Sequence, residues 1–110
     1  MKAAQAAGEP EAAETAAGQQ RLDQWLWHAR FFKTRSLAAR HCVAGGFRVS
    51  GRPVSRASHR VRPGDILTFP YGREIRVVRV LELADHRGPA PQARRLYAEV
   101  EPEAALRQPG

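Results

Sequence analysis

FFKTRSLAAR, residues 31–40, is the stretch around which the rest of the chain is organised. Lys33 and Arg35 flank Thr34, whose hydroxyl suits the free backbone N–H groups that open a helix. The N-terminus of a helix attracts anions, because its first N–H groups point outward and carry partial positive charge. We therefore predict that a second helix begins at Thr34 and that its start forms a phosphate-binding corner.

The residues before this stretch predict a first helix rich in aromatic side chains. Its apolar face consists of residues spaced three and four apart, namely Leu22, Trp25, Leu26 and Ala29. We expect Trp25 and Phe32 to lie in the core. Trp27 lies off the apolar face, so it is expected to be partly exposed, where it can cover the module or stack on a base.

The second helix is predicted to end at the glycine pair 45–46. Its apolar side consists of Leu37, Ala38, His41 and Cys42, so His41 is expected to be a packed histidine. Ser36 and Arg40 share the other side. Cys42 is the single cysteine, which excludes an internal disulfide and indicates a buried thiol in a reducing compartment.

Short antiparallel strands are expected after the second helix. Residues 47–49 and 52–54 alternate around the turn dipeptide Ser50-Gly51, and Pro53 restricts the second strand to an edge. The loop 55–60 carries cations among small hydroxyl residues, which suits a phosphate backbone.

The remaining pattern predicts two longer strands and a helix. The strands are expected at 66–69 and 74–83, and a short C-terminal helix is expected at 91–100. Arg76 and Arg79 would then lie on opposite faces of the last strand, so both are expected to be solvated rather than to share one ligand.

Charge is concentrated in the middle of the chain. Residues 21–80 hold 13 Lys/Arg residues against three acidic residues, a net charge of +10, whereas residues 1–20 and 81–110 are mildly acidic. A polyanion is the natural partner of such a field. Because 1–20 has no aromatic or branched aliphatic residue, we expect a disordered tail there, a domain at 21–100 with its core motif at 21–65, and a frayed end at 101–110.

The order of these pieces resembles a known family. The residues that carry the likeness are Arg21-Leu22-Asp23, Lys33-Thr34-Arg35-Ser36, the segment from Gly45 to Val54 and Gly64-Asp65. They resemble the S4-type RNA-binding domain, or alpha-L motif. This implies an α+β fold in which two packed helices precede a small antiparallel or mixed sheet. The aromatic opening, together with residues 87–90 ahead of the last helix, is similar more narrowly to the heat shock protein 15 family.

The resemblance also implies a function and a set of contacts. Members of the narrower family bind large ribosomal subunits still carrying a nascent chain on tRNA, so the expected partner is ribosomal RNA. The expected location is the cytoplasm, because no stretch of the sequence has the apolar length of a membrane span or a secretory signal. The implied RNA-binding residues are Arg21, Lys33, Thr34, Arg35, Ser36, Arg40, Arg56 and Arg60. One departure is Ser50 where the hairpin turn of this domain often has asparagine, which tolerates a left-handed conformation better.

Other functions remain as alternatives. A small RNase would need two proton-transfer groups, and His28 and His59 are the candidates, but no spacing pairs them with an orienting carboxylate. A helix-turn-helix protein that reads duplex DNA would share the outline of the first two helices. We expect a non-catalytic monomer with no metal, no cofactor and no membrane span.

Overall fold

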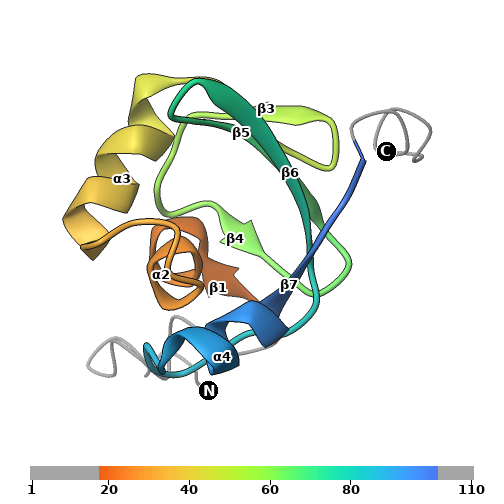
Figure 1. The fold of residues 1–110 in the computed structure, drawn as a ribbon. Helices are drawn as coiled ribbons and strands as arrows, with labels where there is room; N and C mark the ends of the chain where they lie inside the picture. The colour runs from red at the N-terminus through yellow and green to blue at the C-terminus, as the bar shows by residue number, and fades with distance from the viewer. Residues whose placement is uncertain (1–17, 102–110) are drawn as a thin grey trace, which may run out of the picture.

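The computed structural model describes residues 18–101, which form an α+β fold with the predicted order of two helices followed by a sheet (Figure 1). The first half contains β1 (Gln20–Arg21), α2 (Leu22–His28), α3 (Arg35–Ala44), β2 (Phe47–Val49), β3 (Arg52–Val54) and β4 (Arg60–Val61). The second half contains β5 (Ile66–Tyr71), β6 (Glu74–Val80), α4 (Ala90–Ala93), the 3₁₀ turn η3 (Arg94–Leu96) and β7 (Tyr97–Glu99). The fold class predicted from the sequence is confirmed.

Two antiparallel sheets organise the chain. The larger has the order β3-β2-β5-β6-β7, and the smaller pairs β1 with β4. Figure 1 shows α2 and α3 together on one side of the curved larger sheet, with α4 below α2 in this view. The core between helices and sheet holds the predicted stripe of α2 and the inner residues of the strands, including Phe47 stacked on Phe69 with ring centroids 5.1 Å apart.

The hairpin turn adopts the conformation that its sequence made doubtful. Ser50 has a φ of 50° and Gly51 a φ of 87°, so both central residues are left-handed, as a two-residue hairpin with the twist of its strands requires. Asp65 accepts a hydrogen bond from the Ser50 hydroxyl at 3.2 Å. The serine at this position therefore gains a side-chain hydrogen bond to the turn at 62–65. This bond offsets part of the free-energy cost of its left-handed backbone.

The C-terminal prediction was wrong in its second half. The helix expected at 91–100 ends at Leu96, and Tyr97–Glu99 instead form β7 against the edge of β6. Pairing of β7 with β6 satisfies backbone N–H and C=O groups on the edge of β6 that would otherwise be exposed to water. This gain outweighs the weak preference of residues 97–99 for a helix. The strand expected at 74–83 likewise stops at Val80.

Strand β1 begins one residue before the predicted start of the domain. Gln20 is fully buried in β1 and pairs with Val61, so the predicted boundary at Arg21 falls inside an ordered strand. The rest of the tail predicted at 1–20, apart from 18–19, lies outside the described residues, as do 102–110 of the predicted C-terminal end. Within residues 18–101 no helix has the length and apolar character of a membrane span.

Three side chains differ from expectation, two of them because of contacts with distant segments. His41 is exposed on α3, although its ring lies 4.7 Å from that of Phe32. Arg76 is mostly buried: its guanidinium lies over Phe31 and Tyr71 and pairs with Glu99. His28, expected only near a helix end, is fully buried. Trp25 and Phe32 are buried and Trp27 is half-buried, as predicted.

Candidate functional site

The start of α3 has the predicted cap. Thr34 is extended, with φ −135° and ψ 156°, and its hydroxyl oxygen accepts a hydrogen bond from the Leu37 backbone N–H at 3.0 Å. This bond satisfies one of the four N–H groups that a helix start leaves without partners. Lys33 and Ser36, on either side of this start, are both exposed. The Thr34 cap that the sequence predicts is therefore present at the start of α3.

A buried carboxylate joins the starts of the two helices. Asp23 is 4% exposed and accepts two hydrogen bonds from Arg21, from Nε at 3.1 Å and from the terminal nitrogen at 2.9 Å. The Arg35 Nε lies 3.6 Å from the same carboxylate. Asp23 therefore orients Arg21 through a bidentate pair, which restricts a guanidinium in orientation as well as distance, and attracts Arg35 to the same place.

The basic loop 55–60 is attached to the same place. The backbone N–H groups of Leu22 and Asp23 donate to the carbonyls of His59 and Ala57, at 2.8 and 3.1 Å. Strand pairing sets Arg21 opposite Arg60. The loop arginines therefore lie beside the start of α2, and we name Arg21, Asp23, Arg35 and the loop 55–60 the N-terminal corner of α2.

Arg40 is not brought to this corner. It follows Arg35 by five residues, which is about 140° around an α-helix, and it lies opposite the buried residues Ala38 and Cys42. Ser36 and Arg40, four residues apart, are both exposed and share the outer side of α3. The eight predicted residues therefore extend from the N-terminal corner of α2 along the exposed side of α3, and they do not line one pocket.

The electrostatic character of this side follows from the sequence order. Residues 24–64, which contain α3, β2, β3 and β4, hold nine Lys/Arg residues and no Asp or Glu. The exposed acidic residues of the described chain lie later, at Glu74, Glu82, Asp85, Glu99 and Glu101. The fold thus separates a cationic part from a part that carries the acids.

No contacts were predicted from the sequence for two arginines at the other end of α2. Arg30 donates from Nε to the Gly88 carbonyl at 2.8 Å. Arg87 donates to the carbonyls of Trp27 at 3.0 Å and Phe32 at 3.3 Å. These bonds attach the loop after β6 to the connection between α2 and α3. Arg30 carried a local signal, since glycine is usual just after a helix, but the partners of Arg87 are 55 and 60 residues away.

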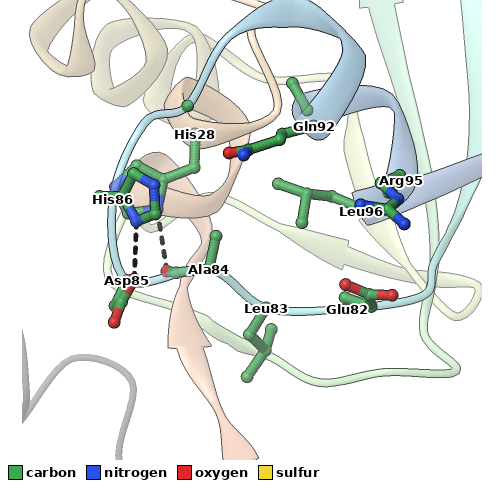
Figure 2. A pocket seen from close by; sticks show the side chains of 11 residues that line it. His28, Glu82, Leu83, Ala84, Asp85, His86, Gln92, Arg95 and Leu96 are labelled. Atoms are coloured by element: carbon green, nitrogen blue, oxygen red, sulfur yellow. Dashed lines mark hydrogen bonds and ion pairs between the residues drawn. The ribbon is translucent and has the colours of Figure 1, made fainter.

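A pocket of about 240 Å³ lies apart from the predicted residues. Figure 2 shows His28, Ala84 and Leu96 around it, between the end of α2, the segment 82–88 and the α4–η3 turn. None of the eight predicted RNA-binding residues lines it. The buried His28 Nδ1 lies 3.0 Å from the Ala84 carbonyl, which gives this ring a structural role.

The other candidates for chemistry have structural explanations. His59, the second histidine considered for an RNase, supplies its carbonyl to Leu22 in the loop at the opposite end of α2 from His28. Burial raises the pKa of the Cys42 thiol to about 12, so it stays protonated at neutral pH. Within residues 18–101 no group of three or more His, Cys, Asp or Glu side chains is arranged to hold a metal ion.

Comparison with known proteins gives a consistent family. A model described as the S4 domain matches residues 20–67. A heat shock protein 15 homolog of Aeromonas salmonicida is 42% identical over 92 residues, which are 84% of this chain and 68% of that protein. The RQC P-site tRNA stabilizing factor of Bacillus subtilis is 38% identical over 65 residues, 59% of this chain and 74% of that protein.

A solved structure matches the fold as well as the sequence. The trimeric structure of Vibrio cholerae heat shock protein 15 aligns with a TM-score of 0.71 and 35% identity, over 81% of this chain and 89% of that chain. The S4 match contains the N-terminal corner, the cap of α3 and the hairpin, which are the features that carried the resemblance in the sequence. The chain therefore belongs to the heat shock protein 15 family and carries its S4 domain at residues 20–67.

Proposed function

We propose that this protein binds structured ribosomal RNA, without catalysis, on large ribosomal subunits blocked with a nascent chain on tRNA. One observation carries the proposal: the acid-free run 24–64 folds so that Arg35 of α3 and the basic loop 55–60 lie beside the start of α2. Family membership supports RNA binding and association with ribosomes. The name of the Bacillus subtilis relative supports a complex that contains tRNA.

The proposed contacts are the eight residues that the resemblance implies. Arg21, Arg35, Arg56 and Arg60 would contact phosphates at the N-terminal corner, and Lys33, Thr34, Ser36 and Arg40 would do so along the start and outer side of α3. Arginine suits this role because its planar fork gives bidentate bonds to phosphate oxygens. The fixed Arg21 and Arg35 guanidiniums favour recognition of a defined RNA shape, as expected for structured RNA.

The salt dependence of affinity tests this proposal. If about five to seven phosphates are neutralised, the logarithm of the affinity for ribosomal RNA should fall with the logarithm of salt concentration by about 0.7 to 0.9 per contact. Replacing Lys33→Ala together with Arg35→Ala should weaken binding by about 3 kcal/mol or more, because charged hydrogen bonds contribute about 1.5 to 3 kcal/mol each. Arg94→Ala, in η3, is the matched control. An affinity nearly independent of salt would contradict the proposal.

A sucrose-gradient fractionation of cell lysate tests the ribosomal partner. We expect the protein to sediment with large subunits, and more strongly when these retain peptidyl-tRNA. Competition by duplex DNA against ribosomal RNA at physiological salt tests the helix-turn-helix alternative, and we expect RNA to win. The expected cytoplasmic location and monomeric state stay predictions; the Vibrio cholerae relative was solved as a trimer. Sedimentation of the isolated protein checks the oligomeric state.

A further inference from the structure

Arg30 occupies a position where the backbone favours glycine. The end of α2 is a Schellman motif: the Phe31 N–H donates to the Leu26 carbonyl at 3.0 Å and the Arg30 N–H to the Trp27 carbonyl at 3.0 Å. In this motif the residue after the C-cap must adopt a left-handed conformation. Arg30 is that residue, and its φ is 67°. A long side chain costs free energy there, and such strain persists mainly where the residue has a use.

Two guanidiniums meet beside this helix end without a carboxylate. Arg30 and Arg87 donate only to backbone carbonyls, and among residues 18–101 neither contacts an Asp or Glu side chain. Burial and the neighbouring Arg30 charge lower the pKa of Arg87. Carbonyls orient a guanidinium but do not neutralise its charge. Arg30 and Arg87 therefore repel each other and together attract an anion.

Trp27 provides an aromatic surface at the same place. Its side chain is half-buried and does not belong to the core cluster. The Arg87 guanidinium lies over the indole, 5.7 Å from the ring centroid. Indole and guanidinium planes both stack with nucleobases. Lys33, adjacent to the Phe32 carbonyl that Arg87 holds, is exposed. We name Trp27, Arg30, Lys33 and Arg87 the C-terminal corner of α2.

We propose that the C-terminal corner of α2 is a second RNA-binding subsite, in which Arg30 and Lys33 contact phosphates and an unpaired nucleobase stacks on the Trp27–Arg87 pair. The inference rests on the proposed function and extends it. The N-terminal corner of α2 binds the phosphate backbone of a structured RNA, and the C-terminal corner of α2 binds a base that is unstacked from the RNA helix. Lys33, between the two corners, would link the two contacts on one RNA.

Arg30→Gly tests the phosphate contact without straining the backbone, because glycine adopts the φ of 67° freely. We expect affinity for ribosomal RNA to fall roughly tenfold and the salt slope to fall by about 0.7 to 0.9, the value of one phosphate. Arg94→Gly removes the same side chain from an exposed position in η3 and should change the affinity for RNA little. Circular dichroism of each variant checks that the fold is retained.

Trp27→Leu tests the base contact. It keeps an apolar side chain but removes the aromatic plane, so affinity for a single-stranded oligoadenylate of about twelve nucleotides should fall roughly five- to a hundredfold with an unchanged salt slope. An abasic oligomer of equal length should bind the wild type and Trp27→Leu equally. Oligoadenylate should quench Trp27 fluorescence, while Trp25 is fully buried and should respond little.

The outcomes separate this inference from the proposed function. If Arg30→Gly and Trp27→Leu both bind RNA as the wild type does, while Lys33→Ala with Arg35→Ala binds weakly, the second subsite is wrong and the proposed function stands. If none of these variants changes RNA affinity, the proposed function is wrong as well. If Trp27→Leu weakens the abasic oligomer equally, the tryptophan has a structural effect and base stacking is excluded.

Discussion

The two ends of α2 hold the same kind of side chain in opposite ways. At the N-terminal corner, Arg21 and Arg35 converge on the buried carboxylate of Asp23. At the C-terminal corner, Arg30 and Arg87 are oriented by backbone carbonyls. A carboxylate cancels one of the two charges it orients, whereas carbonyls cancel none. The number of arginines on a surface is therefore a poor guide to its field; the groups that hold them decide it.

The largest expected effect comes from removing the carboxylate of the N-terminal corner. Asp23→Ala should lower the free energy of unfolding by about 2 to 3 kcal/mol, because it removes a buried carboxylate that pairs with two guanidiniums and accepts a hydrogen bond from the Gln24 N–H. The arginines are each about one third exposed, so water limits the loss. Urea denaturation measures it, and Asp85→Ala, at an exposed acid, should leave stability nearly unchanged.

Asp23→Asn separates charge from orientation in the same comparison. If the field alone mattered, removing a negative charge would strengthen RNA binding and steepen its salt dependence. We expect the reverse, a roughly tenfold weaker affinity, because asparagine can neither hold Arg21 bidentately nor form an ion pair with Arg35. Stronger binding by Asp23→Asn would mean that the carboxylate only reduces the charge of the corner. Titration of ribosomal RNA with each variant distinguishes the two.

A smaller effect is expected at the cap of α3. Thr34→Ala should cost about 1 kcal/mol of stability, because the Leu37 N–H loses its side-chain acceptor. Thr34→Ser keeps the hydroxyl and should restore most of it. Thermal unfolding followed by circular dichroism measures both. Equal stability of the two variants would show that the cap contributes nothing to the fold.

The smallest effect on stability is expected at the C-terminal corner of α2. Arg30→Gly relieves a left-handed arginine but loses the bond to the Gly88 carbonyl, so stability should change by less than about 1 kcal/mol or rise slightly. The same change at Arg94, which has a φ of −66°, should destabilise. A loss at Arg30 well above that at Arg94 would identify Arg30 as a structural attachment of the loop, measured by urea denaturation.

Features encoded by neighbouring residues were predictable from the sequence. The Thr34 cap, the apolar stripe of α2, the half-buried Trp27 and the hairpin around Ser50-Gly51 are all indicated by residues within a few positions of one another, and all are present. The resemblance to a family supplied the candidate contacts, which stay predictions until RNA binding is measured.

Features that join distant segments were not predictable in the same way. Strand β7 exists because the edge of β6 lies beside it, and β1 exists because β4 does. No ion pair was predicted from the sequence for Asp23, since nothing local indicates that Arg35 reaches it. Arg76 was expected to be solvated because its aromatic partners lie on other elements.

The sheet order has a consequence for how this protein folds. The S4 match ends at residue 67, inside β5, yet β5 pairs along its whole length with β6, and Phe69 stacks on Phe47 beyond that point. A chain cut where the family model ends would lose the partner of its central strand and expose the core. We therefore expect that residues 20–67 do not fold cooperatively by themselves, and that the segment after them is needed to complete the fold.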